Sequence, residues 1–123
     1  MAILGFDHLV LRVSDAERSL EFYTGALGLA PVRVDEWRGG SAPFPSVRVT
    51  DRTIIDLVEG DPAPLDHFCL VVERGDAEAL LANPRLTFAD RTAAPRYGAQ
   101  GEGMSLYTTD PDGNTVELRW YSS

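Results

Sequence analysis

The sequence predicts an α+β fold made of two copies of one strand, helix and three-strand unit. The first observation is a repeat, since an Asp-His-apolar segment containing His8 returns as a similar segment containing His67. The second is that an apolar-carboxylate-Leu triplet closes each half, around Asp56 and around Glu117. The third is the length of 123 residues with 44% apolar residues, which suits one compact domain.

The repeat sets the expected domain organisation. Residues Asp7–Val13 match Asp66–Val72, so the only two histidines of the chain fall on the same position of the repeat. We therefore expect a single domain over residues 1–123, with module one at about 5–60 and module two at about 64–121.

Composition excludes several classes of partner. The net charge of -8 opposes binding to polyanions, so we expect no nucleic-acid partner and no membrane partner. The single cysteine, Cys69, excludes an internal disulfide and a cysteine-built zinc site. The first residues lack the pattern of a signal peptide, and no run approaches about 18 apolar residues. We expect a cytoplasmic protein.

Module one is expected to begin with a strand at residues 6–13, which are rich in apolar and β-branched types. Ser14 and Glu17 form a capping box that predicts the start of a helix of about three turns. Glycines near its end, Gly25 and Gly28, suit a left-handed C-cap. Three strands are expected to follow, at about 31–37, 45–50 and 53–59.

Module two is expected to repeat this order. A strand at about 66–73 precedes a short helix at about 76–82, which Pro84 stops. The segment 93–103 has no periodicity and three glycines, which indicates a loop. Asp110–Gly113 has the pattern of a type I turn joining two strands. The three expected strands are about 86–92, 104–109 and 115–121.

Strand periodicity indicates that three residues of metal-binding types converge on one site. Two imidazoles, from His8 and His67, with the carboxylate of Glu117 are a ligand set of divalent iron, manganese, nickel or zinc. A single strand histidine is more often a hydrogen-bonded core residue. The repeat-equivalent positions of the two histidines, and a carboxylate inside an apolar strand, favour metal binding.

Several segments together resemble the vicinal oxygen chelate superfamily, which includes glyoxalase I, bleomycin-resistance proteins, fosfomycin-resistance thiol transferases and extradiol dioxygenases. The resemblance covers nearly the whole chain. The matching segments are Asp7–Asp15, Phe22-Tyr23, Leu27–Leu29, His67 and Asp110–Leu118.

The resemblance implies βαβββ modules that form a curved mixed sheet around a cavity with one divalent metal ion per site, of iron, manganese, nickel, zinc or cobalt. By position, His8, His67 and Glu117 match the metal ligands of the family. Asp56 matches the place of a fourth ligand in glyoxalase-type members, and with Glu117 it is a candidate catalytic carboxylate. Small members usually form homodimers with shared sites, His8 from one subunit facing His67 and Glu117 of the other.

Five further residues are candidates for substrate binding. Arg48 and Arg119 are able to pair with an anionic substrate, although each is equally explained as a solvated strand residue. Ser105 and Tyr107 match positions that contact cation and phosphonate in fosfomycin-resistance enzymes. Trp37 is a candidate wall of an aromatic-lined cavity, or a core residue.

The leading functional hypothesis is a metal-dependent enzyme with glyoxalase-like lyase or isomerase chemistry on a small oxygenated substrate. The alternatives are a non-catalytic drug-sequestering protein of the bleomycin-resistance type and a fosfomycin-type thiol transferase. Extradiol ring cleavage needs a further acid–base histidine, whereas both histidines here are assigned as ligands. The expected partner is therefore a small-molecule substrate or a drug.

Overall fold

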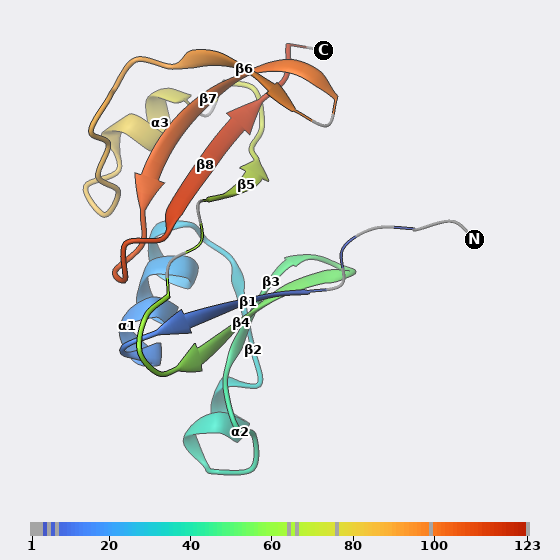
Figure 1. The fold of residues 1–123 in the computed structure, drawn as a ribbon, viewed down its shortest axis with the longest axis vertical. Coiled ribbons are helices and arrows are strands. Elements are labelled where there is room, and N and C mark those ends of the chain that lie inside the picture. Colours follow the sequence, from blue (N-terminus) through green and yellow to red (C-terminus); the bar gives the residue numbers. More distant parts are fainter. Residues whose placement is uncertain are drawn as a thin grey trace. The chain divides into compact units, whose positions relative to one another are not determined.

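The computed structural model describes residues 4, 6, 8–63, 65, 67–75, 77–98 and 100–122. The chain divides into two compact units, residues 1–63 and 64–123, and each is described by itself (Figure 1). Asp7 and Asp66, the first residues of the repeated motif, lie outside the described residues.

The first unit holds a four-stranded mixed sheet in the order β1-β4-β3-β2. Strand β1 runs parallel to β4, and the other two pairs are antiparallel. The strands are β1 (His8–Val13), β2 (Ala30–Val32), β3 (Ser46–Thr50) and β4 (Thr53–Glu59).

The second unit has the same topology, with the strand order β5-β8-β7-β6 and a parallel pair between β5 and β8 (Figure 1). Its strands are β5 (Phe68–Val71), β6 (Ala94–Gly98), β7 (Gly101–Thr109) and β8 (Thr115–Trp120). Because both units place their first strand parallel to their last, the predicted α+β fold of two related modules is confirmed.

The first helix starts one residue later than the capping box predicts. The side chain of Asp15 accepts from the backbone N–H of Arg18, so Asp15 and not Ser14 is the N-cap of α1 (Ala16–Leu20). The helix continues as the π-helical turn η1 (Glu21–Ala26). The predicted end is confirmed at Gly28, whose φ of 75° is the left-handed conformation that glycine tolerates best.

One face of the first sheet forms the core of its unit. Leu11 and Val13 of β1 are fully buried, whereas the alternate residues His8 and Val10 are exposed. Helix α1 packs against β4 (Figure 1) and contributes the buried Leu20 to this core. The alternation leaves the His8 side of β1 as the open face of the sheet.

The strand predicted at 31–37 is wrong beyond Val32. Strand β2 is followed by a short helix, α2 (Val34–Arg38), so Trp37 is a helical residue. Asp35 and Glu36 lie in the first turn of α2 and Arg38 in the last. These charges complement the helix dipole, and this local preference overrides the apolar alternation.

The strand predicted at 86–92 is also wrong, and the predicted loop 93–103 contains β6 and the start of β7. Gly98 pairs with Gly101, so β6 and β7 form a hairpin with a very short connection. Strand β6, and not residues 86–92, pairs with the edge of β7, because a short hairpin closes at a small entropic cost. The alternating Leu86 and Phe88 are still buried, but without a strand.

The remaining local predictions for module two are confirmed. Helix α3 (Ala77–Ala82) ends before Pro84, and Gly113 N–H donates to Asp110 O in the predicted turn. Asp110 is buried and accepts from the backbone and the side chain of Asn114, which fixes the register between β7 and β8. Within the described residues, no helix combines the length and apolar character needed to span a membrane.

Candidate functional site

The open face of the second sheet brings His67 and Glu117 together. Cys69 of β5 lies opposite Glu117 of the parallel strand β8, and His67 lies two residues before Cys69 on the same face. His67 Nε2 is 3.4 Å from Glu117 Oε1. The histidine side chain is 42% exposed, whereas that of Glu117 is 6% exposed. The pair therefore joins a buried carboxylate to an accessible imidazole.

The second oxygen of Glu117 has different neighbours. Its Oε2 accepts from the Ser105 hydroxyl at 2.7 Å, and from Arg119 Nη2 at 3.0 Å and Nε at 3.3 Å. Ser105 lies on β7, directly opposite Arg119 in the antiparallel pair with β8. Two adjacent strands thus hold one carboxylate oxygen and leave the other directed to His67.

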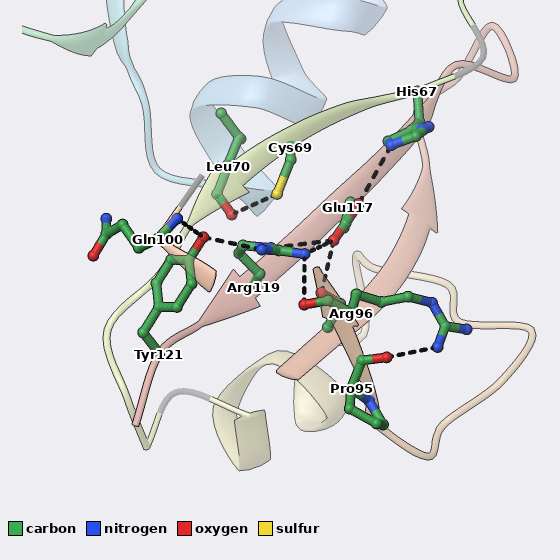
Figure 2. A network of polar contacts seen from close by, with 10 residues as sticks. His67, Cys69, Leu70, Pro95, Arg96, Gln100, Glu117, Arg119 and Tyr121 are labelled. Carbon is green, nitrogen blue, oxygen red and sulfur yellow. Dashed lines mark hydrogen bonds and ion pairs between the residues drawn. The ribbon is translucent and has the colours of Figure 1, made fainter. Parts of the chain in front are cut away.

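Arg119 connects this carboxylate to the β6–β7 hairpin. Its Nη1 donates to the Tyr121 hydroxyl at 2.9 Å, and its Nη2 also approaches the carbonyl oxygen of Arg96 at 3.3 Å. The Tyr121 hydroxyl in turn accepts from the backbone N–H of Gln100. Figure 2 shows this chain of contacts from His67 through Glu117 and Arg119 to Tyr121.

Glu117 and Arg119 each stabilise the charged form of the other. Burial alone would raise the pKa of Glu117, but hydrogen bonds from Ser105 and Arg119, and the charge of Arg119, lower it. The hydrogen bond to Tyr121 raises the pKa of Arg119 despite burial, and Glu117 adds to this effect. Glu117 and Arg119 are therefore an ionised pair at neutral pH.

Cys69 has the properties of an unreactive thiol. Partial burial of the thiol, and then the negative charge of Glu117, raise the pKa of Cys69 to about 11. A protonated thiol is a poor nucleophile and a poor metal ligand at neutral pH.

The first unit contains a similar pair of a buried carboxylate and a serine hydroxyl. Asp56 of β4 lies opposite Ser46 of β3, and the Ser46 hydroxyl donates to Asp56 Oδ1 at 2.7 Å. Both residues are buried. On the same open face, Ile54 pairs with His8 on one side and with Arg48 on the other, and both of these are exposed.

The aromatic candidates lie in different environments. The ring of Tyr107 meets that of His67 edge to face, with centroids 6.4 Å apart. Tyr107 is directly opposite Glu117 in the β7–β8 pair, so it borders the His67–Glu117 site. Trp37 is half-buried on α2 of the first unit and is not part of either open sheet face.

The donor geometry of the second unit fits a metal ion. Two ligands that each lie about 2.1 Å from one ion at a tetrahedral angle are about 3.4 Å apart, which is the separation of His67 Nε2 and Glu117 Oε1. In the part of the chain that the structure describes, three or more His, Cys, Asp or Glu side chains never gather into a metal-binding group. In its described part, each unit by itself therefore brings together fewer than three such groups.

Sequence reasoning did not find several members of the network. It omitted Ser46, whose position opposite Asp56 depends on the register of β3 and β4. It gave Tyr121 no role, although the Tyr121 hydroxyl accepts a hydrogen bond from Arg119. The contribution of the Arg96 carbonyl has no signal in a sequence, because every residue carries this group.

Two modules that share one βαβββ topology, with a His–Glu pair on a sheet face of the second, point to a single superfamily. The chain belongs to the Glyoxalase/Bleomycin resistance protein/Dioxygenase superfamily, which its sequence matches over residues 5–118. The resemblance inferred from the motifs is confirmed.

Individual relatives are distant in sequence. A virulence protein of Salmonella typhimurium is 28% identical, over 98% of this chain and 87% of its own length. Its crystal structure matches with a TM-score of 0.80 at 26% identity, covering 98% of this chain and 99% of that one. A lactoylglutathione lyase of Arabidopsis thaliana is 27% identical over 92% of this chain, which spans 43% of that longer protein.

Proposed function

We propose that this protein is a metal-dependent enzyme that acts on a small oxygenated substrate with glyoxalase-type lyase or isomerase chemistry. The observation that supports this most directly is the pair of His67 Nε2 and Glu117 Oε1, 3.4 Å apart on an open sheet face. The Arabidopsis relative named as a lactoylglutathione lyase supports the reaction class.

One divalent ion per site, of iron, manganese, nickel, zinc or cobalt, is the proposed cofactor. His67 and Glu117 would hold it with His8, and Asp56 is a possible further ligand. When bound, such an ion would supply a Lewis acid for two neighbouring substrate oxygens and would offset negative charge that develops on them.

The carboxylates are assigned to proton transfer. Ser46 holds Oδ1 of Asp56, so Oδ2 is the atom at which Asp56 would exchange a proton. Ser105 and Arg119 hold Oε2 of Glu117, so proton transfer by Glu117 would take place at Oε1. The lowered pKa of Glu117 keeps the carboxylate ionised at neutral pH, which suits a metal ligand, but it makes Glu117 a weaker base than an ordinary carboxylate.

The proposed assembly is a cytoplasmic homodimer with shared sites, in which His8 of one subunit joins His67 and Glu117 of the other. Val10 and Val71 support an interface of this kind, because they are 48% and 62% exposed on the same faces as the two histidines. Exposed apolar side chains on a sheet face favour burial against a partner.

Metal titration tests the proposal. Isothermal titration of chelator-treated protein with zinc, cobalt, nickel and manganese is expected to show micromolar or tighter binding for at least one ion. His67→Ala is expected to lose this binding and to keep its fold, since the side chain is accessible. Thr109→Ala, an exposed change on the neighbouring strand β7, is the matched control.

A second measurement separates substrate chelation from metal binding alone. Oxalate, a small anion with two neighbouring oxygens, is expected to raise the melting temperature only of the metal-loaded protein. Failure of all four ions to bind at micromolar concentration would overturn the enzyme proposal. Stabilisation of metal-free protein by bleomycin would then favour the drug-binding alternative.

A further inference from the structure

The two oxygens of Glu117 lie in very different surroundings. Oε2 accepts three hydrogen bonds, one from the Ser105 hydroxyl and two from Arg119. Oε1 is directed to His67 Nε2 at 3.4 Å. A carboxylate is able to bind a metal ion through one oxygen or through both, and here the hydrogen bonds to Oε2 leave Oε1 as the available one.

Arg119 is fixed in place by groups other than Glu117. Its guanidinium donates to the Tyr121 hydroxyl and to the Arg96 carbonyl, and the side chain is only 4% exposed. Rotation of Arg119 toward a substrate would break all these bonds at once. Arg119 is therefore a poor candidate for direct substrate binding, a role that the sequence also allowed.

The first unit shows that this arginine is not required to bury a carboxylate on such a sheet. Asp56 occupies the repeat position of Glu117 and is held by Ser46. Two residues after Asp56 the chain has Val58, whereas two residues after Glu117 it has Arg119. Only the second module therefore has an arginine beside its buried carboxylate, and burial of the carboxylate alone does not explain it.

We propose that Arg119 is a positioning residue that makes Glu117 a one-oxygen metal ligand and offsets its negative charge. The inference rests on the proposed function, because it assumes that Glu117 binds a metal ion. With Oε2 held, Glu117 presents Oε1 beside His67 and leaves coordination positions open. With the charge offset by Arg119, a bound divalent ion keeps more of its positive charge for an anionic two-oxygen ligand.

The sign of this effect is unusual. The groups that hydrogen-bond to metal ligands are commonly carboxylates or carbonyls, which raise the basicity of the ligand. Their loss weakens metal binding about 10- to 100-fold. A guanidinium acts in the opposite direction, because it draws electron density from the carboxylate and repels the ion. Removal of Arg119 should therefore strengthen metal binding, whereas removal of a merely structural residue should weaken it.

The test is a titration with cobalt(II) alone of chelator-treated wild type, Arg119→Met and Tyr121→Phe. Arg119→Met keeps an apolar stem and removes two of the three hydrogen bonds to Oε2, leaving that of Ser105. It is expected to bind cobalt about tenfold more tightly, on the scale of the effects of groups that contact metal ligands. Tyr121→Phe removes one partner of Arg119 but keeps its contacts with Glu117, so cobalt affinity is expected to stay unchanged. Arg119→Gln, which removes the charge but keeps an amide donor, is expected to tighten binding as well.

The outcomes distinguish the two proposals. Wild type that binds cobalt, with unchanged or weaker binding by the folded Arg119 variants, would overturn this inference and leave the proposed function standing. Wild type that binds none of the ions tested above would overturn both. Loss of folding in both Arg119→Met and Arg119→Gln, checked by circular dichroism, is the result of a purely structural arginine and would also overturn the inference.

Discussion

The hydroxyl of Ser46 donates to the buried carboxylate of Asp56 at 2.7 Å, across adjacent antiparallel strands. The second unit repeats this relationship between Ser105 and Glu117, also at 2.7 Å. The serines are not at equivalent positions, since Ser46 is directly opposite Asp56 while Ser105 is opposite Arg119. Each module thus satisfies its buried carboxylate with a serine from the neighbouring strand.

This relationship predicts unequal effects of two alanine substitutions. Ser46→Ala removes the hydroxyl donor of a buried carboxylate and is expected to cost about 1–3 kcal/mol of unfolding free energy. Ser105→Ala is expected to cost less, because Arg119 still donates to Oε2 of Glu117. Urea unfolding of metal-free protein at neutral pH measures both. An equal or larger loss in Ser105→Ala would contradict the prediction.

Arg48 is predicted to bind the anionic part of a substrate. It is exposed on the open face of the first sheet, on the same row as Ile54 and His8. Arg48→Met keeps the stem and removes the charge, so oxalate binding to metal-loaded protein is expected to weaken by roughly 1.5–3 kcal/mol. Arg52→Met, in the exposed turn before β4, is the matched control. Unchanged oxalate affinity in Arg48→Met would remove Arg48 from the site.

Shared sites predict complementation between two inactive variants. His8→Ala and Glu117→Ala chains are each expected to bind metal poorly alone. Random mixing is expected to restore about a quarter of the wild-type metal sites, because half of the dimers are mixed and each contains one intact site. Absence of recovery, with subunit exchange verified by native mass spectrometry, would place all the ligands within one chain.

The raised pKa of Cys69 predicts slow alkylation. Because the protonated form is favoured in the folded protein, the thiolate is scarce at neutral pH and reaches half of the total only near pH 11. The rate of iodoacetamide labelling of metal-free protein is therefore expected to rise steadily with pH beyond the ordinary thiol range. Cys69→Ser, which should not label, is the control. A rate that levels off at or below pH 9 would show that Cys69 is not shielded as described.

Sequence reasoning succeeded where the pattern is local or repeated. The repeat around His8 and His67 identified the two modules, and the structure shows both histidines as exposed residues. It failed at residues 33–37 and 86–92, where it predicted strands. In the first segment, charges that complement the helix dipole favour α2. In the second, β6 pairs with the edge of β7 through a short hairpin.

The sequence by itself identified the family and singled out the two carboxylates and the two histidines as candidate site residues. These inferences depend only on residue type and spacing. Only the tertiary structure decided which of these groups touch. It showed that Arg119 is a partner of Glu117, and it joined Tyr121 to both through Arg119. The physical reason is that hydrogen bonds between strands depend on register and on side-chain direction, and one-residue differences in register reverse the face that a residue occupies.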